Sequence, residues 1–381
     1  MGLEKEGILG ERMDHSNLEK KIVDMSRKTG REGSNKPFGS APQAEETGAV
    51  RKEIPGRLPL PELKKEVDEI SGLAAIINER LNEFVVGNHD VIDLILLALL
   101  NEGHILVEGV PGTAKTTIAK TIAILTGCSF NRIQGAIDLQ PADMLGVRIY
   151  DQYKKEFVLR KGPVFTNILL ADEINRINPK SQSAFIEAMS ERQVTLDGIT
   201  MPMQSPFCVI ATQNPHEFEG TFPLIEVQRD RFMFSIRSDY LNPDEELSII
   251  RRANDGMLQW EAYSHSLTPL LTPQALKHYI QVIRQVSIEE PVLRYIRDIV
   301  VATRTHPDIE LGGSSRASLA LINGGKALAA LNNRTYVIPD DIKQVSRAAL
   351  THRIILSRDA EVEGITRGQV LDEILSKIEV L

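Results

Sequence analysis

The stretch HILVEGVPGTAKTTIAKTIAIL, residues 104–125, joins a short apolar run to a helical pattern through the loop GVPGTAKT at 109–116. A loop of the form G-x-x-x-x-G-K-[ST] wraps backbone N–H groups around phosphate, while its lysine reaches the β- and γ-phosphates and its hydroxyl reaches Mg²⁺. This loop has Ala114 where that form has glycine. Alanine fits there without strain if φ is negative and is strained if φ is positive. The strand, loop and helix in this order indicate a nucleotide-binding P-loop.

Two adjacent carboxylates, Asp172 and Glu173, end a second apolar run, NILLA at 167–171. In such a position Asp172 would hold Mg²⁺, directly or through water, and Glu173 would orient or deprotonate an attacking water. Taken alone, the pair is more simply explained as a polar strand end, because Asp and Glu are common in loops. The P-loop upstream favours the catalytic explanation.

Three further polar residues stand at predicted strand or helix ends. Asn214 follows a strand-like run and would align the attacking water, although Asn214-Pro215 is also a common turn signal. Arg231 would stabilise transferred phosphoryl charge from a neighbouring subunit, or else form a surface ion pair with Asp230 or another carboxylate. Arg316 is expected in the first turn of a helix, where a cation opposes the helix dipole. This misfit favours a role for Arg316 on the γ-phosphate.

Strand-like apolar runs alternate with helical stretches between about residues 85 and 237. The alternation predicts an α/β fold with a parallel sheet covered by helices on both faces. Hairpin-like insertions at 147–160 and 194–201 interrupt it, the second with Asp197-Gly198 as its turn. They are either rim loops or functional excursions. The five runs are HILVE (104–108), SFNRIQ (129–134), NILLA (167–171), FCVIAT (207–212) and FMFSIR (232–237).

Composition divides the chain into three segments. Residues 1–60 mix both charge signs with Gly, Ser and Pro, so we expect a disordered or weakly helical tail, a solvated extension or else a docking arm. Residues 61–241 hold the alternating strands and helices, beginning with a helix from Pro61. After Asn242 the strand signal stops and helix-start residues precede each periodic run, which predicts an all-helical domain over 242–381.

The 381 residues are 42% hydrophobic and 25% charged, with a net charge of -8, and this composition excludes fibrous and collagen-like proteins. The acidic balance argues against nucleic acid as a partner. Cys128 and Cys208 have no metal-ligand spacing, which favours a reducing compartment. The longest apolar run, at about 92–100, contains Asp93 and is too short to span a bilayer. We therefore expect no membrane span and a cytoplasmic location.

Five segments, GVPGTAKT, LLADEINR, ATQNP, DRFMF and GGSSRASLALINGGKALAAL, resemble in their order and separations the motifs of the MoxR family of AAA+ ATPases. The resemblance extends over about residues 63–357 and includes Ala114, a form that MoxR proteins commonly show. It implies an αβα core with a five-stranded parallel sheet of strand order 5-1-4-3-2 and a helical lid. It also implies a ring, expected to be a hexamer, with ATP and Mg²⁺ at subunit interfaces. Such proteins act as chaperones on client proteins, often ones with a von Willebrand factor A domain.

The resemblance also implies roles for individual residues. The catalytic groups of Walker A, Walker B, sensor 1, the arginine finger and sensor 2 correspond, in that order, to Lys115, Glu173, Asn214, Arg231 and Arg316. In this scheme Arg231 acts on the ATP of the next subunit and Arg316 acts from the lid. Arg229 stands where the family usually has an apolar residue and competes for the finger role; we expect Arg231 to be the finger.

Thr116 and Asp172 are the residues expected to bind the metal. The insertions at 135–160 and 194–203 match the family's helix-2 insert and pre-sensor hairpin, which are expected to face the pore or the client. The residues expected to bind ATP come from the adenine-side segment and from Walker A: Val86, Gly87, Gly109, Val110, Pro111, Gly112, Thr113, Ala114, Lys115, Thr116 and Thr117.

Two other functions fit the same motifs. A nucleic-acid motor would use the basic stretch of the first insertion, Lys154, Lys155, Arg160 and Lys161, although a solvated hairpin face explains these charges more simply. An ATP-gated scaffold would bind nucleotide without meaningful turnover, and the complete Walker B pair argues against it.

Overall fold

The computed structural model describes residues 58–110, 112–215 and 220–379. The expectation of a tail over residues 1–60, and the position of Pro111, therefore fall wholly or almost wholly outside the described residues. The first described helix is α2 (Leu60–Phe84), which begins with Pro61 in its first turn. The start of this helix is where the change in composition placed it.

The central element is a five-stranded parallel sheet in the order β2-β5-β8-β1-β9. Numbered along the chain, its strands run 5-1-4-3-2, so the expected order is confirmed. Because β1, β8 and β5 are neighbours and parallel, their carboxyl ends meet at one edge of the sheet. The strands are β1 (Ile105–Gly109), β2 (Phe130–Gln134), β5 (Ile168–Asp172), β8 (Cys208–Gln213) and β9 (Phe234–Ser238).

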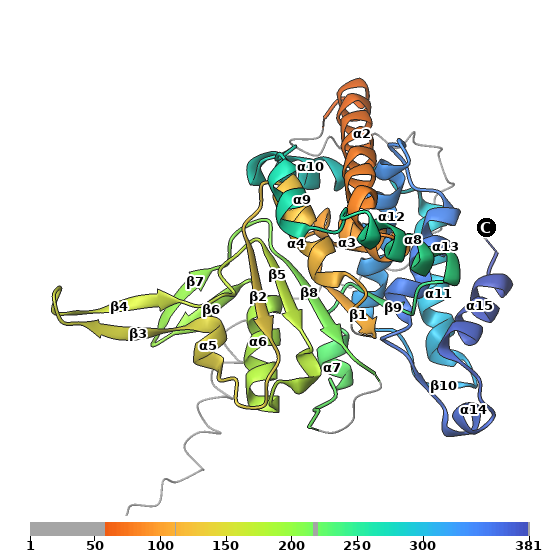
Figure 1. Ribbon diagram of the computed structural model, residues 1–381. Helices are drawn as coiled ribbons and strands as arrows, with labels where there is room; N and C mark the ends of the chain where they lie inside the picture. The colour runs from red at the N-terminus through yellow and green to blue at the C-terminus, as the bar shows by residue number, and fades with distance from the viewer. Residues whose placement is uncertain (1–57, 111, 216–219, 380–381) are drawn as a thin grey trace, which may run out of the picture. The chain divides into compact units, whose positions relative to one another are not determined.

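Helices cover both faces of this sheet (Figure 1). One hydrophobic cluster joins Ile105 and Val107 of β1 to α3 (His89–Leu99) and α4 (Lys115–Leu125). The other joins Leu106 to α5 (Pro141–Leu145) and α6 (Pro179–Glu191). Successive strand residues point to opposite faces, so a strand that is buried on both sides reads as a continuous apolar run.

Both predicted hairpins are present. In the first, β3 (Gly146–Asp151) pairs antiparallel with β4 (Glu156–Lys161) and extends away from the sheet (Figure 1). In the second, β6 (Gln193–Leu196) pairs with β7 (Ile199–Pro202). Asp197 and Gly198 join them with φ of 49° and 78°, the two left-handed residues that a tight hairpin turn requires.

The C-terminal part is helical, as expected. Its helices are α8 (Pro243–Asn254), α9 (Trp260–Ser266), α10 (Pro273–Ile283), α11 (Glu290–Thr305), α12 (Ser315–Leu331), α13 (Pro339–Leu350), α14 (Arg358–Val362) and α15 (Arg367–Lys377). One addition was not expected: β10 (Ile309–Leu311) pairs antiparallel with β11 (Ile355–Leu356). Strands of two or three residues are too short to show an alternating pattern.

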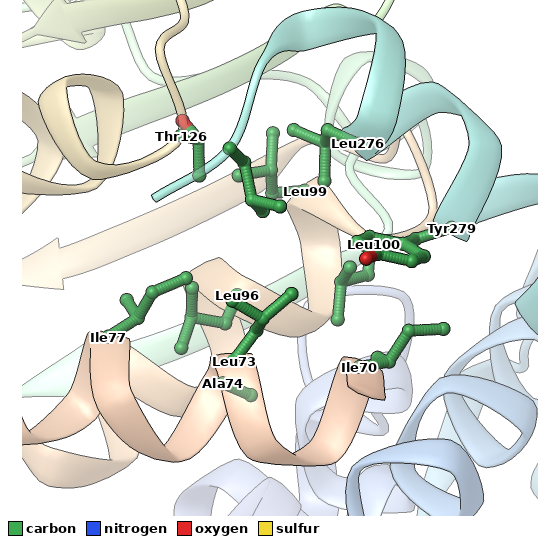
Figure 2. Close-up of a pocket in the computed structure, with 11 residues that line it drawn as sticks. Ile70, Leu73, Ala74, Ile77, Leu96, Leu99, Leu100, Thr126, Leu276 and Tyr279 are labelled. Carbon is green, nitrogen blue, oxygen red and sulfur yellow. The ribbon is translucent and has the colours of Figure 1, made fainter. Parts of the chain in front are cut away.

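An apolar cavity of about 30 Å³ lies between α2, α3 and α10 (Figure 2). Leucine and isoleucine side chains form most of its wall, with the side chains of Thr126 and Tyr279 at its margin. It is a packing defect with few polar groups to orient a ligand. None of the described helices is long and apolar enough to cross a membrane.

Candidate functional site

A polar cavity with a volume of about 400 Å³ lies at the carboxyl edge of the sheet. We call it the P-loop cavity. Strand order explains its composition, because the loops after β1, β5 and β8 leave the sheet side by side. It is lined by Gly109, Gly112, Thr113, Ala114, Lys115, Thr116, Arg132, Asp172, Glu173, Thr212, Gln213 and Asn214.

The P-loop contains a strained residue. Ala114 is the N-cap of α4 and has φ of 55° and ψ of 15°, the left-handed conformation in which alanine is strained. Such strain is characteristic of functional sites. Lys115 Nζ donates to the carbonyls of Gly109 and Val110, at 3.1 and 2.9 Å. Partial burial lowers the pKa of Lys115, and nearby Asp172 opposes that shift.

Thr212 holds both acidic residues in position. Its Oγ1 donates to Asp172 Oδ1 at 2.6 Å and accepts the Glu173 N–H at 2.9 Å. Glu173 has φ of 54°, a second left-handed residue in the same cavity. On its other side, Glu173 Oε2 accepts from Gln134 Nε2 at 3.0 Å. The two carboxylates are therefore fixed by contacts from two neighbouring strands.

The oxygen groups of the P-loop cavity fit Mg²⁺. The Asp172 carboxylate and the Thr116 residue line the same space. Mg²⁺ usually keeps several waters and binds through one or two carboxylates together with substrate phosphates, so it needs no cage of protein ligands. In the part of the chain that the structure describes, no group of three His, Cys, Asp or Glu side chains could form such a cage.

A second, mostly apolar cavity of about 160 Å³ adjoins the P-loop and shares Gly112, Thr113 and Ala114 with it. Val86 lines it together with Phe84, Leu241, Ile249 and Leu258 among others. Its size and lining suit a nucleotide base. Three residues that were expected to bind ATP, Gly87, Val110 and Thr117, line neither cavity.

Arg231 and Arg316 lie in a different place from the other site residues. Both line a separate cavity of about 270 Å³, which we call the arginine cavity, and neither lines the P-loop cavity. Other residues of its wall are Glu102, His104, Arg192, Asp230 and Arg353. Within one chain, the structure thus joins Lys115, Asp172, Glu173 and Asn214 but keeps these two arginines apart from them.

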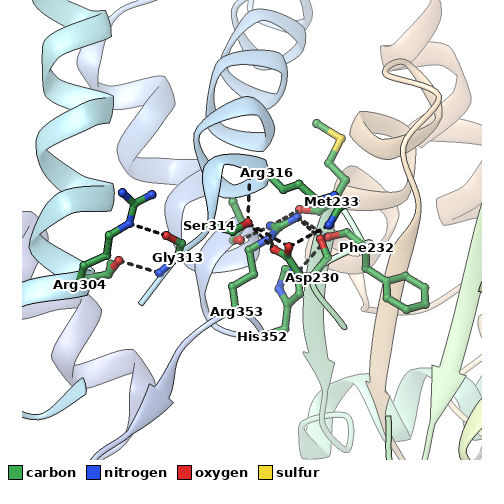
Figure 3. Close-up of polar contacts among 11 residues, drawn as sticks. Asp230, Phe232, Met233, Arg304, Gly313, Ser314, Arg316, His352 and Arg353 are labelled. Atoms are coloured by element: carbon green, nitrogen blue, oxygen red, sulfur yellow. Dashed lines mark hydrogen bonds and ion pairs between the residues drawn. The ribbon is translucent and has the colours of Figure 1, made fainter. Parts of the chain in front are cut away.

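Asp230 organises the arginine cavity (Figure 3). Its carboxylate accepts from Ser314 Oγ at 2.9 and 3.0 Å, from Arg353 Nε at 3.0 Å and from Arg316 Nη1 at 3.3 Å. Arg353 also donates to the carbonyls of Phe232 and Met233, and its side chain is only 3% exposed. This cluster ties the segment before β9 to the C-terminal helices.

The guanidinium of Arg231 does not join the Asp230 cluster. Within residues 58–110, 112–215 and 220–379, no hydrogen bond or ion pair to this side chain is found, so the surface ion pair with Asp230 does not form. Asp230 pairs with Arg316 and Arg353 instead. Arg229 is mostly buried, contacts Glu226 at 3.3 Å and does not line the arginine cavity. Arg231 is therefore the better candidate for an arginine finger.

Sequence reasoning gave no site role to four residues that line these two cavities, Arg132, Thr212, Asp230 and Arg353, or to Gln134, which holds Glu173. Arg132 and Gln134 carry a weak signal, because two polar residues alternate near the end of a strand whose neighbour carries the acidic pair. For Arg353 the local sequence carries no such signal, because its partner Asp230 lies 123 positions away along the chain.

Comparison with known proteins agrees with this geometry. Residues 104–234 match the ATPase family associated with various cellular activities (AAA), and residues 301–374 match the AAA lid domain. Chaperone MoxR1 of Mycobacterium tuberculosis is 40% identical over 322 residues, covering 81% of this chain and 84% of that protein. Protein YeaC of Bacillus subtilis is 43% identical over 303 residues, covering 79% of this chain and 93% of that protein.

A solved structure shows the same fold. The crystal structure of a candidate ATPase from Cytophaga hutchinsonii superimposes with a TM-score of 0.78 at 39% identity. The match covers 84% of this chain and 99% of that one. Together with the AAA and lid matches and the identity to MoxR1, this shows that the chain belongs to the MoxR family of AAA+ ATPases.

Proposed function

We propose that this ATPase hydrolyses Mg²⁺-ATP at the interfaces of a ring, expected to be a hexamer, and uses the cycle to remodel a client protein. One observation carries the proposal: the chain separates its P-loop cavity from the cavity that holds Arg231 and Arg316. A complete site then requires the P-loop cavity of one subunit and the arginine cavity of the next. Heterologous contacts of this kind generate a ring when the rotation between neighbours closes.

The residues of the P-loop cavity would bind the phosphates of ATP and activate the attacking water. The N–H groups around Gly112 and the start of α4 would donate to phosphate, and Lys115 would leave its two carbonyl acceptors for the phosphate oxygens. Glu173, held by Thr212 and Gln134, would orient the attacking water and accept its proton, with Asn214 aligning that water. Mg²⁺, held by Thr116 and Asp172, would supply charge neutralisation for the β- and γ-phosphates.

Arg316 would act together with Arg231 on the neighbour's nucleotide. The resemblance places Arg316 as a lid residue without deciding which subunit's ATP it contacts. Because Arg316 shares the arginine cavity with Arg231 and is absent from the P-loop cavity of its own chain, we propose that both serve the next subunit. Its guanidinium is half exposed and held only at 3.3 Å by Asp230, so it can exchange onto phosphate.

The client would be a protein. The β3–β4 hairpin exposes Tyr150, Tyr153 and Phe157, an aromatic surface that suits polypeptide contact. The relative MoxR1 is named a chaperone, and a client with a von Willebrand factor A domain is the partner that we propose. The buried, unpaired thiols of Cys128 and Cys208 fit the reducing cytoplasm as its location.

The test is steady-state ATP hydrolysis per subunit, measured across a range of protein concentrations with Lys115→Ala as a control. Specific activity that rises with concentration is expected, because dilution separates the two halves of each site. Activity independent of concentration, from a protein that stays monomeric, would refute the shared site. Rates equal to the control at every concentration would favour an ATP-gated scaffold.

A further inference from the structure

The charges of the P-loop cavity come from four residues. Lys115 and Arg132 are its cations, and Asp172 and Glu173 are its anions. The P-loop accounts for Lys115, whereas no motif accounts for Arg132. An arginine beside a phosphate-binding loop and a Walker B pair therefore needs its own explanation.

The sheet brings Arg132 to this place. Strand β2 lies next to β5, and Gln134 is in register with Asp172. Arg132 stands two residues earlier, so its side chain leaves the same face as that of Gln134. Its long side chain reaches the carboxyl edge, where Nη2 donates to Asp172 Oδ2 at 2.6 Å. A second contact runs to Gln134 Oε1.

This contact occupies the carboxylate that is expected to hold the metal. Asp172 Oδ1 accepts from Thr212 and Oδ2 accepts from Arg132, so both oxygens are engaged. The Arg132 side chain is 45% exposed, and an ion pair with that exposure is weakly held and readily exchanged. The terminal phosphate of a nucleoside triphosphate is a stronger acceptor, because it carries more negative charge than one carboxylate and offers three oxygens, two of which can accept from the guanidinium fork.

We propose that Arg132 is a ligand of the terminal phosphate of a nucleoside triphosphate. Until the nucleotide binds, the Arg132 guanidinium stays paired with Asp172. The guanidinium then exchanges from Asp172 Oδ2 to the γ-phosphate, which frees that oxygen for the metal. This inference rests on the proposed function. It assigns to a residue of the same chain the discrimination of triphosphate from diphosphate, since ADP has no γ-phosphate for Arg132 to contact.

The experiment compares two equilibrium dissociation constants for each variant of the full chain, measured by calorimetry with Mg²⁺ present. The probes are the non-hydrolysable ATP analogue AMP-PNP and ADP. Arg132→Ala should weaken AMP-PNP binding by about tenfold and change ADP binding by less than about twofold, the effect of losing one charge-assisted contact. Arg132→Lys keeps the charge and loses the fork, so its AMP-PNP dissociation constant should lie between those of the wild type and Arg132→Ala.

The matched control is Arg237→Ala. Arg237 lies on β9, at the opposite edge of the same sheet, and contacts Asp239 two residues away at 2.8 Å. It lines none of the cavities described above, so both of its dissociation constants should equal those of the wild type.

Three results would overturn the inference: equal weakening of both nucleotides, no change in either, or tighter AMP-PNP binding by Arg132→Ala. The last would mean that Arg132 only blocks Asp172. Failure of the wild type to bind either nucleotide would instead count against the proposed function, so the two failures are distinguishable.

Discussion

The P-loop cavity and the arginine cavity differ in how their charged groups are held. In the P-loop cavity, Asp172 and Glu173 are each fixed by partners from neighbouring strands. In the arginine cavity, Arg231 has no partner among the described residues and Arg316 is half exposed. One cavity is preorganised to bind, while the other presents Arg231 without a partner among the described residues and Arg316 in a half-exposed pair with Asp230. Such a difference is expected if each cavity is half of a site that two subunits share.

Mixing inactive variants gives the largest effect. Glu173→Gln disables the P-loop cavity and Arg231→Ala the arginine cavity, and each should lower kcat by about 10³-fold or more. Mixed in equal amounts, they should regain activity at about a quarter of the interfaces, where two intact halves meet. ATP hydrolysis by the mixture against the separate variants is the measurement.

The same mixture decides where Arg316 acts. Arg316→Ala should complement Glu173→Gln and fail to complement Arg231→Ala, because both arginines come from one subunit. If Arg316 served its own P-loop, mixing it with Glu173→Gln would restore nothing, and the two-cavity scheme would lose one of its two cations.

Removing the buried arginine beneath the arginine cavity should be strongly destabilising. Arg353→Ala leaves Asp230 and several carbonyls without their donor, which should cost about 3 to 5 kcal/mol in the free energy of unfolding. Arg347→Ala is the matched control, because the Arg347–Asp372 pair is exposed and worth about 0 to 1 kcal/mol. Urea unfolding measures both; similar losses would show that the Asp230 cluster does not anchor the helices.

Lowering the pH should destabilise the folded protein through a histidine of the arginine cavity. His104 lines it, and burial together with Arg192 lowers its pKa to about 3 from 6.5. Its Nδ1 accepts the Val209 N–H, so protonation there would break that bond. Below pH 6.5 the unfolded chain binds a proton that the folded chain excludes. The free energy of unfolding should therefore fall by about 1.4 kcal/mol per pH unit until the folded pKa is reached.

Urea unfolding at about pH 7 and about pH 5.5 measures this slope. His104→Gln keeps one donor and one acceptor without titrating and should remove the share of the slope that His104 contributes, whatever its stability at neutral pH. The share of His352, another buried histidine whose pKa is lowered well below 6.5, should remain. An unaltered slope in His104→Gln would assign the acid sensitivity to other groups.

The smallest expected effect concerns strain in the P-loop. Ala114→Gly removes the penalty of a left-handed alanine and gains flexibility in the unfolded chain, so the net stabilisation should be about 0.5 kcal/mol. Ala253→Gly, at an exposed position in α8, should destabilise by about 1 kcal/mol. Opposite signs in thermal or urea unfolding would confirm that the P-loop backbone is held under strain; equal signs would contradict it.

Much of the fold follows from the sequence. Each of the five sheet strands lies within two residues of its strand-like run. The signal is clearest for β1, β5 and β8, because a strand that is buried on both faces is apolar along nearly its whole length. The P-loop and the Asp172-Glu173 pair are local signals as well, since each motif supplies its own chemistry over a few consecutive residues. The exception was the conformation of Ala114, whose sequence allowed either sign of φ.

The sequence alone therefore determined the five sheet strands, the two hairpins, the P-loop and the acidic pair, because these depend on neighbours within one or two turns of chain. Tertiary structure decided which distant side chains meet. Arg132 reaches Asp172 across 40 positions and Arg353 reaches Asp230 across 123. It also decided that Arg231 and Arg316 share a cavity apart from the P-loop. These encounters depend on strand order and on how the C-terminal helices pack against β9, which no local pattern encodes.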